Sequence, residues 1–148
     1  MNLTIDTANA LSTALPRSLE VAVPKGAIGA AGFSNSGYWG IPVNADSYMS
    51  AFYIKGHYVG EITIDLVGAS SGTVYATNVI NVTSNSTEFT YVETNFQSAQ
   101  APDGNNTWHL TFDTSKVAGS ALYFSLMQLY PPTYKGRSGR YLLPIGDR

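Results

Sequence analysis

Residues 61–67, EITIDLV, alternate between polar and apolar side chains as far as Leu66. Successive side chains of a strand point to opposite faces, so this pattern predicts a strand that buries Ile62, Ile64 and Leu66. Similar short runs recur along the chain, separated by turn residues. We predict strands at residues 2–6, 18–23, 38–43, 48–55, 61–67, 73–82, 85–94, 108–113 and 121–130. No stretch has a convincing helical period, so we predict an all-β fold: an antiparallel β-sandwich of jelly-roll type.

The region from Ser34 to Gly56 reads as two strands joined by the turn at residues 44–47. In the second strand, one face carries Tyr48, Phe52 and Ile54, which we assign to the core. The opposite face carries an aromatic ring and a cation, Tyr53 and Lys55, and it is free to meet solvent or a ligand. The glycine-rich residues 27–37 are interpreted as a loop leading into this hairpin. Residues 121–130 are apolar on both faces, which indicates a covered central strand. Phe89, Trp108 and Phe112 are assigned to the core.

Size and charge exclude several classes of protein. The chain has 148 residues and no cysteine, which predicts one domain without disulfides or thiolate metal sites. Only 12 % of residues are charged and the net charge is −2, so nucleic acid is a poor candidate partner. No apolar run approaches the roughly 20 residues that span a membrane. We expect residues 1–134 to form the sandwich and the basic, unpatterned residues 135–148 to form a C-terminal linker or tail.

Four Asn-x-Ser/Thr triplets favour an extracellular, glycosylated protein over chance occurrence, although the motif is short. The acceptors are Asn2, Asn81, Asn85 and Asn105. The N-terminus shows no signal-peptide pattern, as in a chain whose leader has been removed or in an excised fragment.

No catalytic constellation can be assembled from the sequence. Glu61 and Asp65 offer two carboxylates on one strand face, but their outward position favours solvated surface acids over glycoside hydrolysis. His57 and His109 are far apart in sequence and are better explained as surface residues than as ligands. No metal site is assigned and no cofactor is expected, although Asp6 and Asp113 leave structural calcium open.

Aromatic residues are abundant, with ten Tyr, six Phe and two Trp. An aromatic ring can stack on the flat C–H face of a sugar while nearby polar groups bind its hydroxyls. The candidates for stacking are Tyr38, Trp39, Tyr53, Tyr58 and Tyr91. The candidates for hydroxyl binding are Lys55 and Gln128. Core packing remains an alternative for each ring, and for Trp39 above all.

Three segments resemble a known family. Residues 37–41, GYWGI, followed by Tyr48 and by residues 50–56, SAFYIKG, resemble the non-catalytic β-sandwich of fungal α-L-arabinofuranosidases of glycoside hydrolase family 51. That sandwich looks like carbohydrate-binding modules of families 4, 9 and 22. Residues 126–140, LMQLYPPTYKGRSGR, resemble the passage from the sandwich into the catalytic (β/α)₈ barrel, and residues 9–19 fit its lead-in.

The resemblance implies a secreted, non-catalytic module that binds a plant cell-wall polysaccharide such as xylan, arabinoxylan or a β-glucan. Its other implied partner is the catalytic barrel of the parent hydrolase, whose glutamates are not in this chain. An alternative stays open, in which the module is an interdomain scaffold that binds no sugar.

Overall fold

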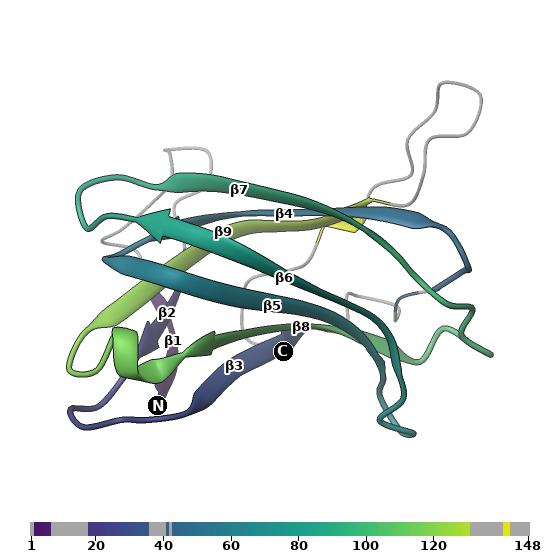
Figure 1. Ribbon diagram of the computed structural model, residues 1–148, viewed down its shortest axis with the longest axis horizontal. Helices are drawn as coiled ribbons and strands as arrows, with labels where there is room; N and C mark the ends of the chain where they lie inside the picture. The colour runs from purple at the N-terminus through teal and green to yellow at the C-terminus, as the bar shows by residue number, and fades with distance from the viewer. Residues whose placement is uncertain (1, 7–17, 36–40, 42, 131–140, 143–148) are drawn as a thin grey trace.

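The computed structural model describes residues 2–6, 18–35, 41, 43–130 and 141–142 of the chain. Two antiparallel sheets lie face to face, with the core between them (Figure 1). The elements are β1 (Asn2–Asp6), β2 (Ser18–Ala22), β3 (Ala30–Asn35), β4 (Ser47–Lys55), β5 (Tyr58–Gly68), β6 (Val74–Ser84), β7 (Thr90–Gln97), β8 (Asn106–Asp113), the 3₁₀ turn η1 (Thr114–Lys116), β9 (Ala121–Tyr130) and β10 (Tyr141–Leu142). The predicted all-β jelly-roll sandwich is confirmed. No helix in these ranges is long and apolar enough to cross a membrane.

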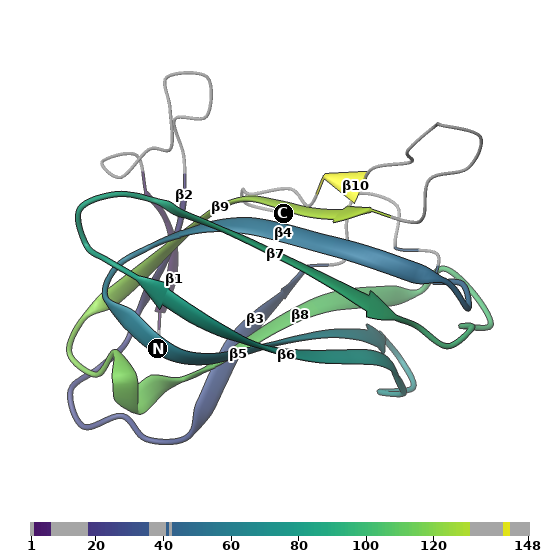
Figure 2. The ribbon, with the colours of Figure 1, turned by 45° about the horizontal axis from the view of Figure 1, so that its top comes forward.

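The first sheet has six strands and the second has four. In the first, the order is β1-β2-β9-β4-β7, and β10 adds to β9 (Figure 2). In the second, the order is β3-β8-β5-β6. The prediction of a central strand at residues 121–130 is confirmed, because β9 has β2 and β10 on one side and β4 on the other.

Local alternation predicts the buried faces correctly. Ile62, Ile64 and Leu66 of β5 are fully buried, while Glu61 is exposed on the other side. In β4 the predicted core residues Tyr48, Phe52 and Ile54 are also buried, as are Trp108 and Phe112 in β8.

The predicted hairpin at residues 38–55 is wrong in its described part. Ile41 and Val43 are buried but belong to no strand, and β4 pairs with the distant strands β7 and β9. The interpretation of residues 27–37 as a loop is also wrong, because Ala30–Asn35 form β3. The strand lacks an alternating pattern because the paired strand leaves no room for a side chain at Gly32. A Cβ at Gly32 would lie 1.7 Å from the backbone oxygen of Leu110 on the paired strand.

Two aromatic assignments need correction. Phe89 is only partly buried and precedes β7, whereas we expected it in the core of a strand at residues 85–94. Tyr58 was a candidate for sugar stacking, but β5 begins at this residue and its ring is fully buried against Phe112. Its hydroxyl donates to the carbonyl of Glu61 (2.6 Å) and accepts from the backbone N–H of Asp113 (3.1 Å).

One hydrogen-bonded chain joins the two sheets inside the core. The indole Nε1 of Trp108 on β8 donates to Ser50 Oγ on β4 (2.9 Å), and Ser50 Oγ donates to the carbonyl of Gln128 on β9 (3.0 Å). Trp108 and Ser50 are both fully buried, so the serine hydroxyl satisfies an indole N–H that water cannot reach.

Candidate functional site

The outer face of the six-stranded sheet carries a group of tyrosines, here called the tyrosine face: Tyr53, Tyr91 and Tyr123. Tyr53 on β4 is the direct cross-strand partner of Tyr91 on β7, and their ring centroids lie 5.1 Å apart at an interplanar angle of 53°. Tyr91 is 48 % exposed. Side chains directly opposite each other on one face of a sheet are held in contact by the ladder, so these two rings form a fixed pair.

Charged groups border these rings on the same face. Tyr91 donates to the Glu93 carboxylate (2.8 Å), and Tyr123 donates to the Glu20 carboxylate (3.1 Å). Lys55 on β4 faces Tyr123 on β9, and its ammonium lies 5.9 Å from the centroid of the Phe89 ring. The face therefore offers flat rings bordered by one cation and two carboxylates, which suits a neutral ligand rich in hydroxyl groups.

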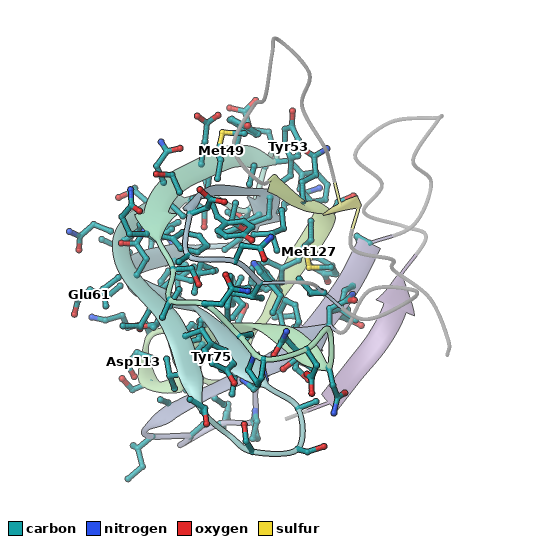
Figure 3. The ribbon with its side chains drawn as sticks, turned by 90° about the vertical axis from the view of Figure 1, so that its right-hand side faces the viewer. Met49, Tyr53, Glu61, Tyr75, Asp113 and Met127 are labelled. Atoms are coloured by element: carbon teal, nitrogen blue, oxygen red, sulfur yellow. The ribbon has the colours of Figure 1, made fainter. Side chains whose placement is uncertain are left out.

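The structure brings together three of the six predicted binding residues: Tyr53, Lys55 and Tyr91. Figure 3 shows Tyr53 with Met49 at one side of the molecule, away from Glu61 and Asp113. Tyr38 and Trp39 lie outside the described residues. Gln128 lies next to Ala51 across the β9–β4 ladder, but it is only 7 % exposed. Its contact with a ligand stays a prediction.

Sequence reasoning missed Tyr123, Glu20 and Glu93. Each alternates with buried or partly buried neighbours on its own strand, which is a local signal that could have marked it as outward-facing. What the sequence did not provide is the strand order β2-β9-β4-β7, which places these residues around Tyr53 and Tyr91.

The carboxylates considered for hydrolysis lie on the outer side of the other sheet. Glu61 faces Asn81 and Asp65 faces His109 across the ladders, and His109 Nε2 lies 2.7 Å from Thr107 Oγ1. His57 is exposed. This placement agrees with surface acids and gives no sign of a reacting pair.

Asp113 is engaged in a local turn. Its Oδ1 accepts from the hydroxyl (2.7 Å) and the backbone N–H (3.0 Å) of Ser115, and these hydrogen bonds hold the pKa of Asp113 below its ordinary value. Among the described residues no group of three His, Asp or Glu side chains could hold a metal ion. The Asp6 side chain lies outside the described part, and structural calcium stays a prediction.

Three of the four glycosylation acceptors have described side chains, and all three are exposed: Asn81, Asn85 and Asn105. Asn85 begins a turn in which its Oδ1 accepts from the backbone N–H of Thr87 and of Glu88, at 3.0 Å each. Asn2 lies in β1, and its side chain is not described.

No family model matches the chain. A probable α-L-arabinofuranosidase A from Aspergillus flavus is 45 % identical over 136 residues, which cover 92 % of this chain and 22 % of the relative. The α-L-arabinofuranosidase A of Aspergillus kawachii is 43 % identical over 135 residues, covering 91 % of this chain and again 22 % of the relative. The chain thus spans about a fifth of the length of the curated relatives it matches.

Among solved structures, an arabinofuranosidase gives the same partial match. An arabinose-bound GH51 α-L-arabinofuranosidase superposes with a TM-score of 0.80 and 31 % identity, over 92 % of this chain and 23 % of that one. A family 16 carbohydrate-binding module shares the fold, with a TM-score of 0.54 and 15 % identity, over 86 % of this chain and 84 % of the module.

Proposed function

We propose, on the premise that this chain is homologous to the β-sandwich segment of fungal family 51 α-L-arabinofuranosidases, that it is a non-catalytic carbohydrate-binding module of such an enzyme. The module binds a plant cell-wall polysaccharide such as xylan, arabinoxylan or a β-glucan. Its other partner is the catalytic (β/α)₈ barrel of the parent hydrolase. Catalysis resides in that barrel, and this chain contributes attachment to the substrate.

The observation that carries the proposal is the Tyr53–Tyr91 pair on the outside of the sheet. Both rings are fixed by a cross-strand register, and Tyr91 leaves about half of its surface open to a ligand. A sugar ring that stacks on these two tyrosines lies on the same face of the sheet as Lys55. The Lys55 ammonium can donate hydrogen bonds to the sugar hydroxyls. Because the two rings are already held in place, they lose little conformational freedom on binding. Even a small platform can therefore contribute to the binding of a polymer with many repeats.

Affinity gel electrophoresis with soluble polysaccharides tests this function. We expect retardation by at least one of xylan, arabinoxylan or β-glucan, and its loss in Tyr91→Ala, because the exposed half of the platform is removed. Val79→Ala is the matched control, since Val79 is 53 % exposed but lies on the outer side of the other sheet. Unchanged migration with every polysaccharide would remove the proposal.

A second candidate function is an interdomain scaffold that binds no sugar. Three exposed valines on the outer side of β5 and β6 favour it, because apolar side chains on a sheet face suit packing against another domain: Val59, Val74 and Val79. The scaffold is expected to self-associate when isolated and to gain heat stability from added catalytic domain. A monomer on size-exclusion chromatography with an unchanged melting temperature would count against it.

The proposed module is extracellular and glycosylated. The exposed acceptors Asn81, Asn85 and Asn105 are accessible to the modifying enzyme. Mass spectrometry of the protein secreted from a fungal host is expected to find glycan on at least one of them. Secretion with all three unmodified would contradict the glycoprotein assignment and leave the polysaccharide binding untouched.

A further inference from the structure

The turn between β6 and β7 contains Asn85, an exposed acceptor in the triplet Asn85-Ser86-Thr87. Asn85 Oδ1 accepts from the hydroxyl of Thr87 (2.7 Å) and from the backbone N–H of Thr87 and of Glu88 (3.0 Å each). These three hydrogen bonds fix the amide plane with its oxygen directed into the turn. The Nδ2 group, to which a glycan is joined in a glycosylated asparagine, forms the other arm of the amide and has no partner among the described residues.

This turn is fastened to the end of β4, the strand that carries Tyr53. The backbone N–H of Gly56, the residue that follows β4, donates to the carbonyl of Asn85 (2.7 Å). The buried hydroxyl of Ser84 donates in turn to the carbonyl of Gly56 (2.6 Å). Figure 2 shows the β4–β5 and β6–β7 connections at the same end of the sandwich. The position of Asn85 is therefore set relative to the end of β4.

The other side of the turn reaches the tyrosine face. Phe89 lies between the acceptor triplet and β7, and its ring centroid is 5.9 Å from the ammonium of Lys55. Lys55 in turn faces Tyr123 across the β4–β9 ladder, on the outer face of the six-stranded sheet. The Lys55–Phe89 pair therefore forms the border between the tyrosine face and the turn that carries Asn85.

The other two described acceptors lie away from this border. Asn81 pairs with Glu61 across the β5–β6 ladder, on the outer side of the four-stranded sheet. Asn105 lies at the opposite end of the sandwich, where its Nδ2 donates to Ser70 Oγ (2.8 Å) in the β5–β6 turn. Of the three described acceptors, Asn85 is the one whose glycan would begin beside the tyrosine face.

We propose that Asn85 carries an N-linked glycan, and that this glycan limits the access of a polysaccharide to the Lys55 end of the tyrosine face. The inference rests on the proposed function, that of a secreted module that binds polysaccharide. The donor for the modification is a lipid-linked pyrophosphoryl oligosaccharide. A bond forms between Asn85 Nδ2 and the anomeric carbon of the first sugar, the bond from that carbon to the pyrophosphate oxygen breaks, and Nδ2 loses one hydrogen as a proton.

The expected effect is steric. An N-linked glycan is bulky and hydrated, and here it starts from a turn that hydrogen bonds hold in place. A polysaccharide chain that passes from Tyr91 and Tyr53 towards Lys55 continues into the space next to this turn. The glycan therefore shortens the part of the face that a long chain can cover, and it weakens binding without a contact to either tyrosine.

The test compares the full chain secreted from a fungal host with the same chain from a bacterial host that attaches no such glycan. Peptide mass spectrometry should find glycan on Asn85 of the secreted protein. Affinity gels then use the polysaccharide that retards the bacterial protein. Secreted Thr87→Ala lacks the acceptor motif but keeps Asn85, and it should bind about threefold or more tightly than the secreted parent. Secreted Thr87→Ser keeps the motif and a hydroxyl, so it is the matched control and should bind as the parent does.

An endoglycosidase that trims the glycan to its first sugar should give the secreted parent the same gain in affinity without any substitution. An unmodified Asn85 in the secreted protein would overturn the proposal. Equal retardation of the secreted parent, the trimmed parent and Thr87→Ala would also overturn it. The same is true of a gain from Thr87→Ala in the bacterial protein, because that gain would come from the turn itself. If no polysaccharide retards even the bacterial protein, the proposed function fails and this inference fails with it, so the bacterial protein separates the two failures.

Discussion

Ser50→Ala should destabilise this sandwich far more than the same substitution at Ser125. Ser50 and Ser125 are both buried, at 0 % and 1 % exposure. Ser50 Oγ accepts from the Trp108 indole and donates to a β9 carbonyl, whereas Ser125 Oγ has no hydrogen-bond partner among the described residues. Removing the Ser50 hydroxyl leaves a buried indole N–H unpaired, which costs about 1–3 kcal/mol. Removing the Ser125 hydroxyl deletes a polar group that is already unsatisfied.

Urea denaturation followed by tryptophan fluorescence and circular dichroism measures both variants. For Ser50→Ala we expect a loss of about 2 kcal/mol in the free energy of unfolding, and a fall in melting temperature of roughly 4–8 °C for a domain of this size. For Ser125→Ala we expect no loss or a small gain, because a buried hydroxyl without a partner is itself unfavourable. Equal losses in the two variants would refute the reasoning, since burial alone would then explain both. A Ser50→Ala variant as stable as the parent would refute the importance of the bond between the sheets.

Three further predictions follow from the described contacts. Tyr58→Phe should lower the free energy of unfolding by about 1–2 kcal/mol, because the hydroxyl satisfies two backbone groups. Burial raises the pKa of Tyr58, so its contribution is complete below the ordinary pKa near 10 and is lost as pH rises above it. The Tyr58→Phe variant should therefore lose less stability than the parent between neutral and strongly alkaline pH. Urea titrations that show the same loss in both proteins would contradict this. Gly32→Ala should cost more than about 3 kcal/mol or prevent folding, since its Cβ would overlap a backbone oxygen. Gly72→Ala should cost only about 1 kcal/mol, because the positive φ of 72° strains an alanine but no atom lies within 4 Å of its Cβ. Equal melting temperatures for the Gly32→Ala and Gly72→Ala variants would refute the steric argument. The pKa of Asp113 is lowered by hydrogen bonds from Ser115, so this carboxylate stabilises the fold above its ordinary pKa and the benefit is lost as pH falls through the lowered value. Ser115→Ala should raise that pKa in an NMR titration, and an unchanged value would contradict the assignment.

The sequence by itself determined the fold class and the inward face of most strands. Alternation at residues 61–67 is a local signal with period two, and it placed Ile62 inside and Glu61 outside without any knowledge of partners. The same reasoning placed Tyr53 and Lys55 on the outer face of β4. Each of these conclusions depends only on which way successive side chains point along one strand.

The tertiary structure alone decided which strands pair. The expected hairpin at residues 38–55 failed because β4 finds its partners 36 to 81 residues later in β7 and β9. That choice sets Tyr91 against Tyr53 and brings Tyr123 to Lys55. The contact between the β5–β6 turn and the chain entering β8 has the same origin, since the backbone N–H of Ala69 reaches the carbonyl of Asn105 only in the folded sandwich. A period-two pattern records the direction of a side chain but carries no record of register or strand order, which are set by how all the faces pack together.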